Sequence, residues 1–140
     1  MFFTFNMLTN QQIDIILEEL EQDEQVQAVL LTGSYVYGDP NDESDLDIRV
    51  ITKDGSNWAE KYRMRFGHKV ELFCNPPEVI RNYFDTNRKE NKPHALHFWT
   101  YGKIIYDPTG IAKQLKDEAT KLLELGPYDG SWEKSKKHNT

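Results

Sequence analysis

Hydrophobic residues recur along this chain with two different spacings, and these spacings predict alternating helices and strands. Apolar residues three and four positions apart indicate amphipathic helices, whereas short apolar runs and strict alternation indicate strands. The segment 58–66 is ambiguous, but the alternation of Tyr62, Met64 and Phe66 with arginines favours a strand. The predicted helices are residues 10–22, 77–86, 93–101 and 111–125, and the predicted strands are residues 26–32, 45–52, 58–66, 69–74 and 103–106.

Turn-forming residues separate these predicted elements. The sequence contains no internal repeat and no segment that reads as a linker between domains. The main breaks are Gly33-Ser34, the cluster 39–42, the segment 53–57 and a polar loop predicted at 87–92. We therefore expect one α/β (α+β) domain over residues 1–126, with a mixed, partly antiparallel sheet. Residues 127–140 are expected to form a polar, loosely ordered tail.

Composition narrows the classes of protein that fit. The chain has 140 residues, of which 38% are hydrophobic and 29% charged, as in an ordinary soluble domain. A formal net charge of −6 argues against a surface for duplex nucleic acid. There is one cysteine, no run of about 20 apolar residues and no signal-peptide pattern. We expect a cytoplasmic protein without a membrane partner.

Two aspartates in one predicted strand are the first candidates for chemistry. Because a strand points alternate side chains to opposite faces, Asp45 and Asp47 share a face. Leu46, Ile48 and Val50 then point the other way, into a core. Two carboxylates in an apolar context repel each other and are costly to bury. A bound cation is the simplest reason for such a pair.

A third acid, Glu71, lies in the next confident strand with apolar neighbours. If the two strands pair, Asp45, Asp47 and Glu71 converge on one face. Such a cluster suits one or two Mg²⁺ ions, which prefer oxygen ligands and in pairs clamp the attacking and leaving oxygens. Glu71 then accepts a proton or shares a metal with the acceptor, and the sequence does not separate these roles. The plainer alternative is an ion pair with Arg49 or Lys69.

Gly33 and Ser34 are candidates for holding a phosphate. Glycine lets the backbone approach a phosphate closely, and the serine hydroxyl adds a donor. A helix opening at Ser34 would direct free N–H groups at the anion. Arg49 shares the face of the aspartates and can balance the charge. Together these residues indicate phosphoryl or nucleotidyl transfer from a metal-bound triphosphate.

These residues resemble a known signature. Gly33-Ser34, ten intervening residues and Asp45-Leu46-Asp47 are similar to the signature of the DNA polymerase β-like nucleotidyltransferase superfamily. Within it, the chain resembles the small bacterial members: minimal nucleotidyltransferases paired with helical HEPN proteins, and antibiotic nucleotidyltransferases. The resemblance spans residues from about 10 to 125, including VELFCNP and HALHFWTYGKIIYDPTG.

The resemblance implies a nucleotidyltransferase fold, with a mixed sheet of about five strands flanked by helices. It implies Mg²⁺, a nucleoside triphosphate (commonly ATP) and release of pyrophosphate. It assigns Gly33 and Ser34 to the phosphate, Asp45 and Asp47 to the metal, and Glu71 to the third acid. The acceptor would be a hydroxyl of a protein or of a small molecule such as an antibiotic.

The antibiotic-modifying relatives usually carry a further C-terminal domain that helps to bind the acceptor. Drug modification by this chain would require that a homodimer partner supplies this part, or that the chain is a fragment of a longer enzyme. The alternative function is an antitoxin-like module that neutralises a helical HEPN-type partner, with or without catalysis.

Overall fold

A five-stranded mixed sheet forms the centre of the molecule in a computed structural model that describes residues 7–38, 40, 44–53 and 61–132. The strand order is β3-β4-β2-β1-β5. The strands are β1 (Val26–Thr32), β2 (Leu46–Thr52), β3 (Lys61–Arg65), β4 (His68–Asn75) and β5 (Lys103–Tyr106). The pair β2–β4 is parallel, and the other three neighbouring pairs are antiparallel.

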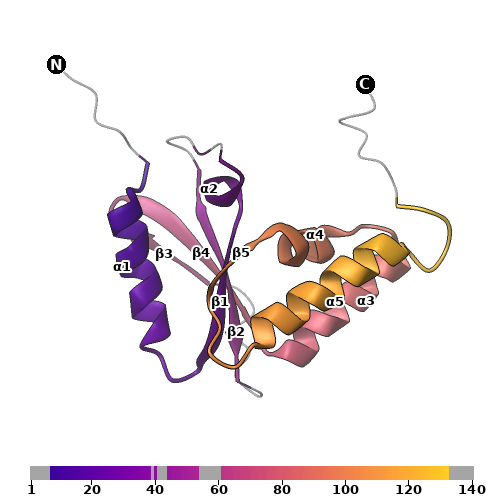
Figure 1. Cartoon of the computed structure of the whole chain (residues 1–140). Coiled ribbons are helices and arrows are strands. Elements are labelled where there is room, and N and C mark those ends of the chain that lie inside the picture. Colours follow the sequence, from indigo (N-terminus) through magenta and orange to yellow (C-terminus); the bar gives the residue numbers. More distant parts are fainter. Residues whose placement is uncertain (1–6, 39, 41–43, 54–60, 133–140) are drawn as a thin grey trace.

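Helices cover both faces of this sheet, which gives three layers (Figure 1). The helix α1 packs on one face, and α3, α4 and α5 form a layer on the other. The short α2 follows β1 directly. The helices are α1 (Asn10–Glu21), α2 (Ser34–Tyr37), α3 (Pro77–Glu90), α4 (His94–Tyr101) and α5 (Ile111–Leu125).

Alternation along the central strands divides the core into two clusters. Leu46, Ile48 and Val50 of β2 are buried with the apolar stripe of α1. Ile51 is buried on the opposite face, with Phe84 of α3 and the residues of α4 and α5. The alternate residues of β2 therefore face the layer of α3, α4 and α5.

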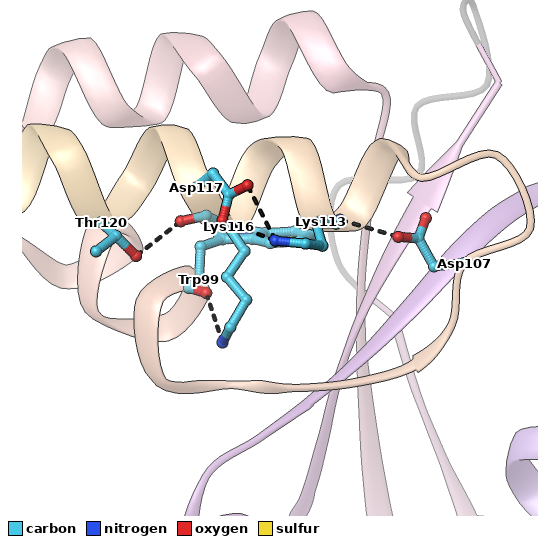
Figure 2. Close-up of polar contacts among 6 residues, drawn as sticks. All are labelled: Trp99, Asp107, Lys113, Lys116, Asp117 and Thr120. Atoms are coloured by element: carbon cyan, nitrogen blue, oxygen red, sulfur yellow. Dashed lines mark hydrogen bonds and ion pairs between the residues drawn. The ribbon is translucent and has the colours of Figure 1, made fainter.

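A lysine joins α5 to the end of α4. Figure 2 shows Lys116 of α5 reaching the carbonyl of Trp99, with an N–O distance of 3.5 Å. Its Nζ also donates to the carbonyl oxygens of Thr100 and Gly102, each at 2.7 Å. One side chain thus satisfies carbonyls that the helix itself leaves without partners at its C-terminus.

The helix α3 is longer than the sequence predicts. The prediction of a loop at 87–92 is wrong for residues 87–90, because the helix continues to Glu90; Asn91, with φ 58°, and Lys92 lie beyond its end. The Asn87 side chain accepts the backbone N–H of Leu96, and Lys89 pairs with Asp85 at 2.9 Å. These polar residues therefore form the outer side and end of a helix.

Smaller differences concern the segments beside β3 and after α5. Of the strand predicted at 58–66, residues 61–65 form β3, whereas 58–60 lie outside the described residues. Residues 127–132 were expected to be loosely ordered but contact the helices. The Tyr128 N–H donates to the carbonyl of Arg88 at 3.2 Å, and the Trp132 indole donates to that of Leu123 at 2.8 Å.

Candidate active site

Strand pairing brings the three predicted acids to one end of one sheet face. In the parallel pair β2–β4, Asp47 and Glu71 are direct Cα partners, so their side chains leave the same face. Asp45 lies just before β2 and shares this face by alternation, and its carboxyl hydrogen-bonds that of Glu71. The sequence left the pairing of these strands open, and the structure brings the acids together.

Burial and mutual repulsion raise the pKa of Asp47. The main cause is desolvation of its half-buried carboxyl, and the charge of Asp45 raises the pKa further. The positive charges of Arg49 and Lys69 act in the opposite direction without cancelling the rise. The ionised carboxylate is thus held in an environment that disfavours its charge.

Glu71 is perturbed in the same direction. Desolvation raises its pKa first, followed by the hydrogen bond with Asp45 and the charges of both aspartates. Lys69 opposes the rise, and its Nζ lies 3.6 Å from the Glu71 carboxylate. The ion pair that the sequence offered as a plainer role for Glu71 is therefore present, but within an acidic cluster rather than in place of one.

Gly33 lies against the carboxylate of Asp47. Its φ of +84° and ψ of −166° belong to a region that only glycine adopts readily. A Cβ atom added at Gly33 would lie 2.8 Å from the Asp47 Oδ2. Ser34 follows as the first residue of α2 and is half-buried. The predicted phosphate turn thus lies against Asp47, one of the two acids of the predicted metal pair.

Arg49 is fixed between two aromatic rings. Its guanidinium carbon lies 3.8 Å from the ring centroid of Phe73 in β4 and 4.0 Å from that of Phe98 in α4. Cation–π contacts of this kind hold a guanidinium plane in place. The sequence placed Arg49 on the acidic face but gave no sign of the two rings, because they come from separate elements.

The acidic cluster has the donor chemistry that a hard divalent cation requires. Its donors are carboxylate oxygens, and both acids with perturbed pKa values are perturbed against ionisation, which a cation would reverse. In their present positions, however, no three His, Cys, Asp or Glu side chains among the described residues are arranged to hold a metal ion. The residue types fit a metal ion, and holding one would require the carboxyl groups to reorient.

A cavity of about 680 Å³ lies away from these acids. It is lined by α1, α2 and β5, including Leu17, Tyr35 and Ile105, which pack on the α1 side of the sheet. None of the three acids lines it. The candidate site is therefore the end of the opposite sheet face, not this hollow.

Comparison with known proteins places the chain in a family. The family model of the nucleotidyltransferase domain matches residues 13–120. The chain belongs to the nucleotidyltransferase domain family. This membership, with the five-stranded mixed sheet, confirms the fold expected from the sequence.

A solved structure shares the fold. It is a nucleotidyltransferase-like protein from Exiguobacterium sibiricum, with a TM-score of 0.58 and 19% sequence identity. The match covers 79% of this chain but only 38% of that one, so the shared fold is a minor part of the longer protein. None of the curated proteins matches the sequence. Within the described residues, no helix is long and apolar enough to cross a membrane.

Proposed function

We propose that this domain transfers a nucleoside monophosphate from a Mg²⁺-bound nucleoside triphosphate, with ATP as the expected donor, to a hydroxyl group. Family membership supports nucleotidyl transfer in general. The observation that carries the proposal is the contact between Gly33 and Asp47 beside the pairing of Asp47 with Glu71. To hold a metal-bound triphosphate, a protein needs a turn that the phosphates can approach closely and a cluster of acids for the metal.

The residues have distinct proposed roles. Asp45 and Asp47 hold Mg²⁺, with Glu71 as the third acid. Bound Mg²⁺ neutralises the triphosphate and the charge that develops on its oxygens. Gly33 lets the backbone come close to the phosphates, and Ser34 offers its hydroxyl. The fixed guanidinium of Arg49 keeps a positive charge near Asp47, which opposes the rise in the pKa of Asp47.

The proposed reaction is a nucleotidyl transfer to a hydroxyl oxygen. The acceptor oxygen attacks the α-phosphorus, a new P–O bond forms, and the bond from the α-phosphorus to the pyrophosphate oxygen breaks. Glu71 takes the hydroxyl proton, and pyrophosphate leaves with the bonding electron pair. The protein contributes mainly by holding the donor, the acceptor and the opposing charges in place.

The test is transfer of a labelled nucleotide. Purified protein is incubated with each α-³²P-labelled nucleoside triphosphate, Mg²⁺ and candidate acceptors: a panel of hydroxylated antibiotics and helical HEPN-type proteins. We expect label on an acceptor and an equal amount of pyrophosphate, both abolished by EDTA. Asp45→Asn and Asp47→Asn should each lower the rate at least about a hundredfold, since they remove charge needed by the transition state.

Absence of both label transfer and pyrophosphate with every triphosphate, from protein shown to be folded by circular dichroism, would contradict the proposal. Equal rates for the wild-type protein and both Asn variants would contradict the assigned site.

A further inference from the structure

Two aromatic rings from different elements enclose Arg49 beside the acids. In the parallel pair β2–β4, Phe73 is the direct Cα partner of Arg49, just as Glu71 is the partner of Asp47. The two pairs are two residues apart along their strands, which is about 6–7 Å, and they lie on the same face of the sheet. Phe98 reaches the same guanidinium from α4. Phe73 and Phe98, called here the arginine clamp, therefore stand next to the acidic cluster.

Packing of the core does not account for the clamp. Phe73 and Phe98 are each half-buried, and neither belongs to the two clusters of buried apolar residues. Their neighbours in the chain do belong to these clusters: Leu72 is 1% exposed and Trp99 is 3% exposed. The contact that the two clamp rings share is the guanidinium of Arg49.

The helix α4 is packed closely enough to hold its clamp ring in a fixed place. Leu96 and Trp99, on either side of Phe98 in the chain, are buried in the core. At the end of the helix, a Cβ atom added at Gly102 would lie 2.6 Å from the carbonyl oxygen of Phe98 and 2.7 Å from the Cδ2 atom of Leu30 in β1. The backbone at Phe98 is thus fixed relative to the sheet.

A clamped guanidinium is better prepared to bind an anion than a free one. An arginine side chain loses rotamer freedom when it binds a ligand, and this loss is smaller if the side chain is already ordered. The N–H donors of a guanidinium lie in its plane, so rings on its faces leave these donors available at the edge. Such donors suit phosphate oxygens.

We propose that Phe98 is a positioning residue for the nucleoside triphosphate, and that it acts with Phe73 by holding the Arg49 guanidinium in place for a phosphate oxygen. The inference rests on the proposed function, in which Arg49 supplies positive charge to the site. It extends the determinants of nucleotide affinity to α4, a helix that contains none of the predicted site residues.

The experiment measures the Kd of Mg²⁺ with α,β-methylene-ATP, in which a bridging carbon prevents nucleotidyl transfer, by isothermal titration calorimetry. The single variants are Phe98→Leu, Phe98→Tyr, Phe73→Leu and Arg49→Met, and both Leu substitutions are repeated in the Arg49→Met protein. Tyr101→Leu is the matched control, because Tyr101 is an aromatic residue of α4 that is 59% exposed and whose ring lies 5.9 Å from that of His97. Pyrophosphate release from ATP by the wild-type protein is measured separately.

We expect Arg49→Met to raise the Kd about tenfold or more, the effect of losing a hydrogen bond to a charged group. Phe98→Leu and Phe73→Leu should each raise it about threefold to tenfold, because one cation–π contact is lost. Phe98→Tyr keeps the ring and should keep the affinity. In the Arg49→Met protein, the two Leu substitutions should change the Kd less than about 1.5-fold, since residues that act through one another are not additive. Tyr101→Leu should match the wild-type protein.

Three outcomes overturn the inference while the proposed function stands. These are equal effects of the Leu substitutions with and without Arg49, which would show a purely structural role, wild-type affinity in both Leu variants, and wild-type affinity in Arg49→Met. If circular dichroism shows that Phe98→Leu does not fold, Phe98→Tyr and the Phe73→Leu pair of proteins decide the question.

Failure of the proposed function has a different signature. A wild-type protein that binds the analogue but releases no pyrophosphate under any condition contradicts nucleotidyl transfer, whereas the binding measurements still decide the role of the clamp. A wild-type protein that does not bind the analogue at all overturns both.

Discussion

At the scale of single residues, the carboxyl of Asp47 is held in place at a cost to the fold. It is half-buried, near a second acid and in contact with the Gly33 backbone. Its pKa is raised chiefly by burial, which means that ionisation of this group weakens the folded state. A carboxyl group whose pKa is shifted in this way is typical of a functional site.

Asp47→Asn should therefore stabilise the protein when no divalent cation is present. The folded pKa of Asp47 lies above its unfolded value, so its charge destabilises the fold at neutral pH, and this penalty disappears as pH falls through the folded pKa. In EDTA at pH 7.5 we expect the Tm to rise by about 2–4 °C, equivalent to about 1 kcal/mol in a domain of this size. The gain should shrink to nothing near pH 4, the ordinary carboxyl pKa. A gain that did not vary with pH would contradict this account.

Gly33→Ala should damage activity more than stability. The new Cβ would meet the Asp47 carboxylate at 2.8 Å and displace it. We expect turnover to fall at least about tenfold, since misplacing a catalytic group by 1 Å has effects of this size or larger. The positive φ adds a loss of about 1–3 kcal/mol in the free energy of unfolding, measured in urea.

Gly110→Ala is the control for this variant. Gly110 shares the φ of +84° but has ψ 6°, in the left-handed helical region, and a Cβ added there would meet no atom of the described residues within 4 Å. It should lose stability and keep turnover. Equal loss of turnover in both variants would show that the contact with Asp47 has no specific role.

The sequence alone predicts the relative positions of some of these residues but not of others. Alternation alone places Asp45 and Asp47 on one face, because the period of a strand is a local property. Which residues lie beside Asp47 depends on strand pairing and register, because these bring together residues that are far apart in the chain. The positions of Glu71 and Gly33 around Asp47, and of the rings around Arg49, therefore required the structure.

At the scale of elements, the bounds of strongly periodic segments were predicted correctly, whereas the polar end of a helix was not. The strands 26–32 and 103–106 and the helix 111–125 have the predicted bounds. The end of α3 was missed because Asn87 and Lys89 read as a polar loop. Their helical state depends on partners in α4 and one turn earlier in α3, which composition does not reveal.

Lys116→Met should weaken the packing of α5 on α4. Burial lowers the pKa of Lys116, so its ammonium depends on the carbonyls of Thr100 and Gly102 for the contacts it has lost with water. Removing it leaves these carbonyls without their donor, at a cost of about 1–3 kcal/mol. Urea unfolding of the wild-type and variant proteins measures the difference.

Lys113→Met makes the same chemical change three residues earlier. The Lys113 side chain is 70% exposed, and its ion pair with Asp117 at 3.2 Å is solvated. Its loss should cost less than about 0.5 kcal/mol. If both variants lost equal stability, the carbonyl contacts of Lys116 would not be the cause.

At the scale of the whole molecule, the layers explain why the site lies where it does. The helix α1 closes one face of the sheet, and α3, α4 and α5 close part of the other (Figure 1). The contact of Phe98 with Arg49 reaches that face of β2, and the half-buried acids lie farther toward the start of the strand. The fold thus supplies a covered core and a partly open acidic end, in a chain whose net charge is −6.

This arrangement predicts that a metal and a triphosphate stabilise the domain together rather than separately. We expect Mg²⁺ to relieve the repulsion among Asp45, Asp47 and Glu71, and the triphosphate to supply further oxygen ligands to the ion. At a ligand concentration of 100 Kd the gain is about 2.7 kcal/mol. That gain corresponds to a rise in Tm of about 5–10 °C in differential scanning fluorimetry. Mg²⁺ alone or triphosphate with EDTA should give a smaller rise, and Asp45→Asn should abolish the joint effect. A full shift with triphosphate and EDTA would show that binding does not depend on a metal, and the role given to the acids would then be wrong.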